Sequence, residues 1–431
     1  MIYELFFRRT FIMQTYASME KTALLHELAK LEGYYENYKA QGLSLNMARG
    51  KPGSAQLDIS NDMFNSLTPD TDFKTADCPD CRNYGGLEGI VEARQLFADM
   101  LGVEVKNVMV GGNSSLNMMF DTIACMMEQA WGNQGKLKFL CPAPGYDRHF
   151  GITQYFNIEM ITVPMTSTGP DMDIVEKLVS EDASIKGIWC VPKYSNPQGI
   201  TYSDETVKRF AALKPAAKDF RIMWDNAYIV HDVSDTPDTL LNIFDELKKN
   251  GNEDMAFEFC STSKITFPGA GVAALAASEN NIALLKKRYT FQTIGYDKLN
   301  MLRHVKYFGD FKGLLAHMQK HKAVLQPRFD MVTDTLEREL AGLGIAEWAK
   351  PNGGYFVSVN VMEGCAKRVV ELCKNAGVVL TGAGATYPYG KDPKDSNIRV
   401  APTYPPIEEL EAAMNIFCIC VKIAALEKLT K

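Results

Sequence analysis

The chain has 431 residues, of which 46% are hydrophobic and 23% are charged, which is typical of a folded globular protein with room for two domains. Its formal net charge of −6 provides no basic field, so binding to nucleic acid is not expected. Six scattered histidines argue against a histidine-built metal centre, and no metal is predicted.

The first residues, MIYELFFRRTFIMQTYASMEKT, do not fit a signal peptide, because charges interrupt the apolar stretch and no small-residue cleavage site follows. Met13 and Met19 could each be the initiator, so residues 1 to about 18 are interpreted as an upstream start without a function. No apolar run is long enough to cross a bilayer, and no membrane association is expected.

The ten cysteines mostly lie within apolar runs, which indicates reduced core residues and a cytoplasmic protein. Cys78 and Cys81 form a CPDC pair that could belong to a redox motif or half of a zinc site. No second pair follows at the spacing of a zinc finger, so packing is the favoured interpretation.

The segment 19–42 predicts an amphipathic N-terminal helix that packs with the C-terminal region. From about residue 105 to residue 280, β-rich runs alternate with helical stretches. This alternation predicts a largely parallel sheet covered by helices on both faces, with ligands at the carboxyl ends of the strands. The predicted strands lie in NVMVGG (107–112), KFLCPAP (138–144), IEMITVP (158–164), KGIWCVP (186–192), RIMWDNAY (221–228), FEFCSTS (257–263) and GVAALAAS (271–278).

A long helical run from Lys312 separates this region from a different pattern, in which GGYFVSVNV (353–361) predicts a half-buried strand. We therefore expect three segments. Residues 1–60 form an N-terminal helix and arm that belong to a small domain, residues 61–314 form a large ligand-binding domain, and residues 315–431 complete the small α/β domain.

Polar groups follow several predicted strands. GGNSS (111–115) places Asn113, Ser114 and Ser115 at a helix N-terminus, where amides and hydroxyls can hold a phosphate, or where they serve as an ordinary helix cap. Tyr146 follows a Pro-Gly turn and could stack on a flat heterocycle or be a partly buried tyrosine. Asn196, before Pro197, could donate to a ring oxygen or cap a turn.

Asp225 and Lys264 each follow an apolar strand, where a charged group is costly unless it is paired. Tyr228 can offer a hydroxyl to the same place. A ligand with a phosphate arm, a flat ring, a basic ring nitrogen and an aldehyde would satisfy all these groups, and pyridoxal 5′-phosphate (PLP) is such a ligand. Lys264 would bind the aldehyde as a Schiff base, and Asp225 would keep the ring nitrogen protonated.

The order of GGNSS, PGYDRH, NPQG, DNAY, STSK and IRVAP resembles the class I aminotransferases of PLP fold type I, over residues 45 to 420. Most similar is the divergent aspartate-aminotransferase-like subgroup that is sometimes mislabelled as MocR-type regulators. The resemblance implies a large domain with a mostly parallel seven-stranded sheet between helices, a smaller α/β domain built from both termini, and a homodimer with shared active sites.

The resemblance also implies a role for each matching residue. Lys264 would be the Schiff-base lysine and proton carrier, and Asp225 would pair with the ring nitrogen with His149 behind it. The remaining matches are Asn196 and Tyr228 at the ring oxygen, Tyr146 stacked on the ring, Asn113, Ser114, Ser115, Ser261 and Ser263 at the phosphate, Tyr84 at the partner subunit's phosphate, Gly50 beside the substrate, and Arg399 at the substrate α-carboxylate.

One residue departs from this pattern, and the identity of one substrate-binding residue stays open. The family usually has an arginine eight residues after the lysine, where this chain has Val272, so hydroxyls, backbone dipoles or another cation must balance the phosphate. The cation that would bind the distal group of a dicarboxylic substrate is not identified either. The candidates, each of which could simply be a solvated surface residue, are Arg49, Lys51, Lys298 and Arg303.

The predicted activity is ping-pong transamination between an L-amino acid, with aspartate or glutamate as the first choice, and a 2-oxo acid. Another PLP reaction on the same scaffold, β-elimination by a C–S lyase or decarboxylation, is the alternative. A PLP-binding transcription regulator would need a DNA-binding domain before residue 45, where only one helix is expected. A nucleotide-binding α/β protein would leave Lys264 and Asp225 unexplained.

Overall fold

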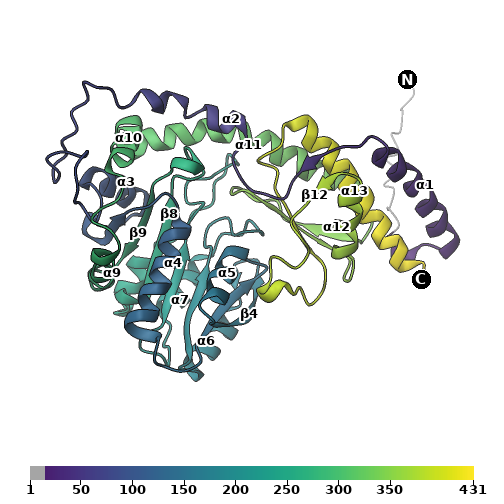
Figure 1. Cartoon of the computed structure of the whole chain (residues 1–431). Coiled ribbons are helices and arrows are strands. Elements are labelled where there is room, and N and C mark those ends of the chain that lie inside the picture. The colour runs from purple at the N-terminus through teal and green to yellow at the C-terminus, as the bar shows by residue number, and fades with distance from the viewer. Residues whose placement is uncertain (1–14) are drawn as a thin grey trace, which may run out of the picture.

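The computed structural model describes residues 15–431, and the first fourteen residues of the expected upstream start lie outside this part of the chain. An eight-stranded sheet forms the centre of the larger half of the molecule (Figure 1). In the order in which they lie side by side, the strands are β2 (Val108–Val110), β9 (Ala273–Ala277), β8 (Ala256–Ser261), β7 (Arg221–Asp225), β6 (Ile185–Cys190), β3 (Lys138–Ala143), β4 (Glu159–Thr166) and β5 (Gly169–Pro170).

Strands β8, β7, β6, β3 and β4 run parallel, whereas β9 is antiparallel to both of its neighbours and β5 is antiparallel to β4. All seven predicted strands are present. The eighth strand, β5, was not expected, because it consists of two residues that turn back on the end of β4, too few to produce a periodic pattern.

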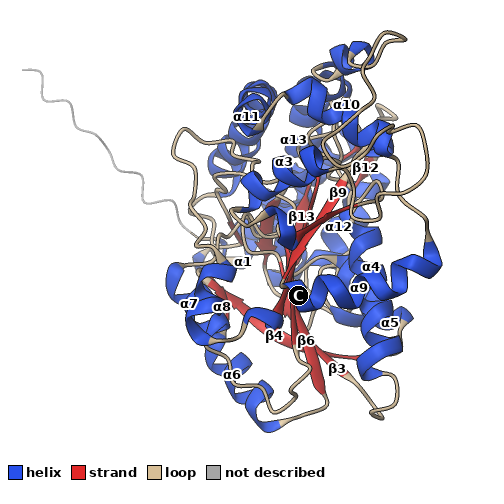
Figure 2. Ribbon diagram, turned by 90° about the vertical axis from the view of Figure 1, so that its left-hand side faces the viewer, coloured by secondary structure: helices blue, strands red, loops and turns tan. Residues whose placement is uncertain are grey.

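Helices cover both faces of this sheet (Figure 2). Met223 of β7 packs on one face, together with α4 (Ser115–Met126), α5 (Asp147–Tyr155) and α9 (Glu279–Gln292). Its neighbours Ile222 and Trp224 point to the other face, since successive side chains of a strand alternate. The helices on that face are α3 (Val91–Leu101), α6 (Met172–Glu181), α7 (Asp204–Ala211), α8 (Ile243–Asn250) and α10 (Lys298–Phe308).

The smaller half contains an antiparallel sheet of β10 (Ala346–Trp348), β11 (Val357–Val361) and β13 (Asn397–Val400) and a parallel pair of β1 (Leu45–Asn46) and β12 (Val378–Val379). Strand β11 is central, and four of its five residues are buried, so the expectation of a half-buried strand was wrong. It is covered because α11, α12 and α13 pack in the same apolar cluster.

The helices of this half are α1 (Lys21–Lys39), α2 (Ser54–Asp58), α11 (Phe311–Leu340), α12 (Ala366–Asn375) and α13 (Ile407–Leu429). Leu24 and Leu31 of α1 join the same apolar cluster as α13, which confirms that the N-terminal helix packs with the C-terminal region. Helix α11 links the two halves. Its first turns pack beside α3 and α10, and its later turns, from Leu325 onward, pack against α13.

Between residues 15 and 431, no helix is both long enough and apolar enough to span a bilayer. The same part of the chain holds no group of three or more side chains arranged to bind a metal ion. All ten cysteines are free and buried, and Cys78 and Cys81 pack in the core beside α3, as the packing interpretation predicted.

Candidate active site

The predicted site residues gather where the parallel strands end. Asp225 is the last residue of β7, and Ser261 is the last residue of β8, with Lys264 three residues further on. Because β7 and β8 are parallel neighbours in register, their carboxyl ends meet at one edge of the sheet. The sheet thus brings together Asp225 and Ser261, which lie 36 positions apart in the chain.

Asp225 is buried, and only one of its oxygens has a partner. His149 of α5 donates a hydrogen bond from Nε2 to Asp225 Oδ2 at 2.9 Å, and the His149 ring stacks on Trp189 with the ring centres 4.3 Å apart. Asp225 Oδ1 is buried without a hydrogen-bond partner. A buried carboxylate oxygen without a hydrogen-bond partner costs free energy. A bound molecule that donates a hydrogen bond to Asp225 Oδ1 would remove this cost.

The Lys264 amine lies beside a pair of stacked tyrosine rings, 5.1 Å from the centre of Tyr228 and 5.7 Å from the centre of Tyr355. Burial lowers the pKa of Lys264, while the Asp225 carboxylate acts in the opposite direction. The Lys264 amine and the Asp225 carboxylate are therefore close enough to interact electrostatically. A lowered pKa increases the fraction of neutral amine, which is the nucleophilic form.

Three histidines and Tyr355 hold the turn that carries Lys264. His304 Nε2 of α10 lies 3.0 and 2.9 Å from the hydroxyl oxygens of Thr262 and Thr266. His317 of α11 donates to the Ile265 carbonyl at 2.8 Å, and the remaining contacts are made by His321 Nε2 with His317 at 3.1 Å and by the Tyr355 hydroxyl with the Lys264 carbonyl at 3.4 Å.

The five residues predicted at the phosphate come from two loops that touch. Ser263 donates from its hydroxyl to the Asn113 carbonyl at 3.2 Å, and Ser261 donates to Ser263 at 3.1 Å. Ser114 precedes α4 and donates to Asn117 at 2.7 Å, and Ser115 is the first residue of α4. Hydroxyls and amides at a helix N-terminus suit an anion.

Tyr146 and Tyr228 share this electrostatic environment. Burial raises the pKa of Tyr146, Asp225 and Asp147 raise it further, and Arg399 lowers it. Burial also raises the pKa of Tyr228, with further contributions from Tyr146 and Asp225 and an opposing one from Arg399. Both hydroxyls therefore stay protonated at neutral pH and are available as donors.

Arg399 of β13 reaches the site from the smaller half. Its Nη1 donates to Asn196 Oδ1 at 3.2 Å and to Asp147 Oδ1 at 3.0 Å, and its Cζ lies over the Phe356 ring, 4.7 Å from the ring centre. A Cβ atom at Gly50 would lie 2.3 Å from the Phe356 ring, so only glycine fits there. The structure thus brings Gly50, Asn196 and Arg399 to one side of the site.

Tyr84 lies apart from the other predicted residues, on a surface loop, and its side chain is 83% exposed. Lys298 of α10 is 4% exposed and donates to the carbonyls on either side of Tyr84, those of Asn83 at 2.7 Å and Gly85 at 2.6 Å. Lys298 therefore fixes the Tyr84 loop, and its amine is not free to bind a substrate.

The other three candidate cations differ in their surroundings. Lys51 lies 4.0 Å from the Tyr404 ring centre, and Arg49 is exposed. Arg303 donates to Asn300 at 2.5 Å, its Nε is buried without a partner, and it lines a cavity of about 510 Å³ together with Asn113 and Val272.

Sequence reasoning missed Tyr355, Asp147 and Phe356 as parts of the site. Tyr355 and Phe356 were read as ordinary residues of the GGYFVSVNV strand, although the double glycine before them indicates a close backbone approach. Asp147 directly follows Tyr146, and an acidic residue in the first turn of a helix needs no further explanation.

A lysine with a lowered pKa beside a buried carboxylate, at the strand ends of a helix-covered parallel sheet, defines a ligand-dependent enzyme site. The model of the family described as "Aspartate amino-transferase" matches residues 19–431, and the chain belongs to this family. An aspartate aminotransferase of Corynebacterium glutamicum is 46% identical over 419 residues, with 95% of each chain covered.

Solved structures agree with this membership. The crystal structure of an aspartate transaminase from Corynebacterium glutamicum superposes with a TM-score of 0.94 at 44% identity, covering 97% of this chain and 100% of the other. A multiple substrate aminotransferase from Thermococcus profundus has a TM-score of 0.74 at 22% identity, covering 94% and 98% of the two chains, and shows the shared fold alone. The expected fold type I architecture is confirmed.

Proposed function

We propose that this protein is a PLP-dependent aminotransferase that moves an amino group between aspartate or glutamate and a 2-oxo acid. The observation that carries the proposal is the Asp225 carboxylate, which is held by His149 on one oxygen, lacks a partner on the other, and interacts with the Lys264 amine. The similarity to an aspartate aminotransferase supports the choice of substrate.

The residues present fit PLP. The unpartnered Asp225 oxygen would accept from the protonated ring nitrogen, and Asn196 and Tyr228 would bind the ring oxygen next to a stacked Tyr146. Asn113, Ser114, Ser115, Ser261 and Ser263 would hold the phosphate. When bound, PLP supplies an aldehyde that takes up the amino group and a ring that accepts electrons.

Lys264 has two tasks in this proposal. Its amine would hold PLP through the aldehyde, and once a substrate amine has taken its place, the same nitrogen would carry the proton of the substrate Cα. The neighbouring rings of Tyr228 and Tyr355 limit the positions that Nζ can occupy on their side. Arg399 orients the substrate by its α-carboxylate, as an arginine fork suits a carboxylate.

Arg303 would balance part of the phosphate charge. The arginine that usually does so in the family is replaced here by Val272. Arg303 lines the same cavity as Asn113 and Val272, and no carboxylate among the described residues forms an ion pair with it. The hydroxyls and the α4 N-terminus would provide the rest.

A homodimer with shared active sites would place Tyr84 at the partner subunit's phosphate. Its high exposure supports an interface at this surface, and the exposed Ile294 precedes Gly295, whose backbone lies against Gly85. The free, buried cysteines support a cytoplasmic location. Separate apolar clusters support the division into segments 1–60, 61–314 and 315–431.

An absorbance spectrum with and without amino acid tests the proposal. The purified protein reconstituted with PLP should absorb in the visible region, and the band should shift when aspartate is added. Aspartate and 2-oxoglutarate should yield oxaloacetate and glutamate, whereas release of a thiol, pyruvate and ammonia from a cysteine conjugate would indicate elimination. Lys264→Ala should lose turnover by at least about 10³-fold while keeping its fold by circular dichroism. Wild-type turnover in this variant would refute the assigned role.

A further inference from the structure

Arg399 already has an anionic partner inside the chain. Its side chain is 8% exposed and forms an ion pair from Nη1 to Asp147 Oδ1 at 3.0 Å, while the Asp147 side chain is 35% exposed. Nη1 also donates to Asn196, and Nη2 donates to Thr381 Oγ1 at 3.3 Å. Nε is buried without a partner.

These contacts limit how a second carboxylate can bind. An arginine holds a carboxylate best through two parallel N–H groups, and both hydrogens of Nη1 are directed at Asp147 and Asn196. An incoming carboxylate must therefore use the Nη2 and Nε side or replace Asp147. In either position it meets a guanidinium whose charge is partly neutralised and a like charge nearby, which weakens its binding.

Asp147 is suited to such competition because its side chain is partly exposed and its backbone belongs to a helix. It is the first residue of α5, directly after Tyr146, so the helix holds its backbone in the site. Its partial exposure lets water solvate the carboxylate when the ion pair opens, so opening costs much less than for a fully buried pair.

We propose that Asp147 sets the affinity of the site for carboxylates by competing with the substrate for Arg399. This inference rests on the proposed function, in which Arg399 binds the α-carboxylate. A ping-pong transaminase exchanges one 2-oxo acid for another in every cycle, so each product must leave before the next acid binds. An internal carboxylate that takes over Arg399 promotes that release.

Asp147→Asn tests the proposal, since it removes the charge and preserves the shape. Succinate, a dicarboxylate without an amino group, is titrated into the PLP-loaded protein by calorimetry. Its Kd should fall at least about fivefold in the variant, from the loss of one like charge at this distance. The KM for aspartate should fall as well, and kcat should not rise with it.

Asp173→Asn is the matched control, because Asp173 is 87% exposed, pairs with Arg209 of α7 and carries the same charge away from Arg399. Its succinate Kd should equal that of the wild type. Asp147→Ser provides a second variant should Asp147→Asn fold poorly. If a folded Asp147 variant has an unchanged or raised Kd for succinate, Asp147 does not compete with the substrate. Its role is then only to hold Arg399 in position.

Arg399→Ala distinguishes a failure of the proposed carboxylate site from a failure of the proposed role of Asp147. If this variant loses succinate binding while Asp147→Asn leaves it unchanged, the carboxylate site stands and the role of Asp147 falls. If Arg399→Ala binds succinate as the wild type does, the proposed carboxylate site is wrong, and the role of Asp147 falls with it.

Discussion

Lys264 depends for its chemistry on side chains that come from distant parts of the chain. The rings of Tyr228 and Tyr355 lie next to its amine, and burial lowers its pKa against the opposing effect of Asp225. A lowered pKa increases the share of neutral amine, which is what a nucleophile that also carries protons requires.

Arg303 provides a test of the phosphate site at the level of one residue. Arg303→Met should weaken PLP binding about tenfold or more, because a cation without a carboxylate partner is lost beside a doubly charged anion. Binding of pyridoxal, which lacks the phosphate, should change less than twofold. Fluorescence titration of the apoprotein measures both constants.

Lys306→Met is the control for Arg303→Met, because Lys306 lies one turn further along α10, is exposed, and carries the same charge. It should bind PLP as the wild type does. Equal weakening of PLP and pyridoxal in Arg303→Met would point to a distorted fold instead of a lost phosphate contact.

The residues that could be predicted from the sequence pattern alone are those that follow strands, whereas Gly50, His149 and Arg399 were predicted only through the family resemblance. Asp225 and Lys264 each end an apolar run, and parallel strands place such ends at one edge. Tyr355, Asp147 and the histidines around the Lys264 turn could not be predicted in the same way. They reach the site from helices or from another sheet, and no local periodicity records which distant segment a side chain will contact.

At the scale of elements, α10 and α11 hold the Lys264 turn through buried neutral histidines. Burial lowers the pKa of His304 to about 4 and that of His321 to about 4, against about 6.5 in an unfolded chain. The unfolded state therefore binds more protons between these values. The stability that the histidines contribute is complete above pH 6.5 and is lost as the pH falls toward 4.

His304→Gln should consequently flatten the pH dependence of unfolding. The slope of the unfolding free energy between pH 4 and 6.5 should decrease by about 1.4 kcal/mol per pH unit relative to the wild type. Urea unfolding at a series of pH values measures it. His26→Gln, at an exposed position of α1, should keep the wild-type slope, and a change of equal size there would remove the explanation.

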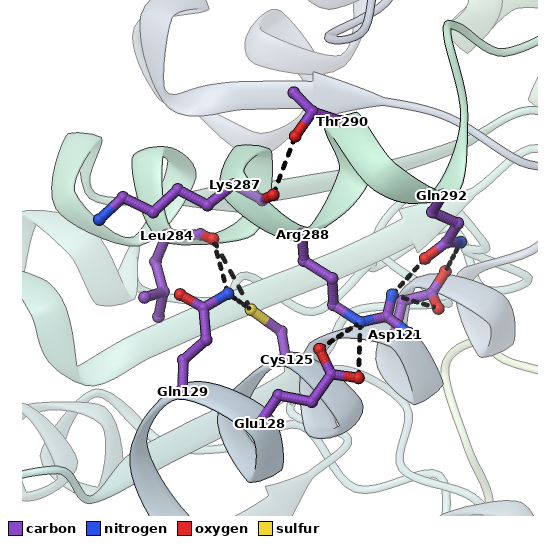
Figure 3. A network of polar contacts seen from close by, with 9 residues as sticks. All are labelled: Asp121, Cys125, Glu128, Gln129, Leu284, Lys287, Arg288, Thr290 and Gln292. Atoms are coloured by element: carbon purple, nitrogen blue, oxygen red, sulfur yellow. Dashed lines mark hydrogen bonds and ion pairs between the residues drawn. The ribbon is translucent and has the colours of Figure 1, made fainter.

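Helices α4 and α9 are joined by a polar network over the sheet (Figure 3). Arg288 of α9 forms ion pairs with Asp121 at 3.0 Å and Glu128 at 3.2 Å, and it also donates to Gln292, which itself donates to Asp121 at 3.0 Å. The side chains of Arg288 and Asp121 are mostly buried, so water screens this pair less than a surface pair.

Arg288→Met should lower the unfolding free energy by about 1 to 2 kcal/mol, since it leaves the mostly buried Asp121 carboxylate without its cationic partner. Lys287→Met removes the same charge from the next residue, which is exposed and points away from Asp121 and Glu128 (Figure 3). It should change stability by less than about 0.5 kcal/mol. Urea unfolding monitored by circular dichroism compares the two variants, and equal losses would contradict a specific role for the network.

Seven strands of the large sheet could be predicted because buried parallel strands are continuous apolar runs of recognisable length. Strand β5 could not, because two residues carry no period. The degree of burial of β11 was also underestimated. The polar Ser358 is buried because Asn397 donates to its hydroxyl at 2.9 Å, and this partner lies 39 residues away.

At the scale of the whole molecule, the candidate site lies between the two halves. Asp225 and Lys264 come from the eight-stranded sheet, whereas Arg399 and Tyr355 come from the smaller half. In the proposed dimer Tyr84 would come from the other subunit, and this predicts complementation between inactive subunits.

Lys264→Ala and Tyr84→Ala subunits should each give dimers with little activity. After co-refolding, half of the dimers are mixed, and each mixed dimer has one site with both Lys264 and Tyr84 intact. Activity should recover to about one quarter of the wild-type value per site, from random pairing of two subunit types. Separately refolded parents, combined afterwards, serve as the control, and no recovery on co-refolding would contradict shared sites.

The turn around Lys264 is held at once by α10, by α11 and by Tyr355, which stands before β11. The visible absorbance band of the PLP-loaded protein would then report on the packing of both halves. Mild denaturant or a distant core substitution that loosens one of these supports would change the visible band before the far-ultraviolet signal of the helices begins to fall.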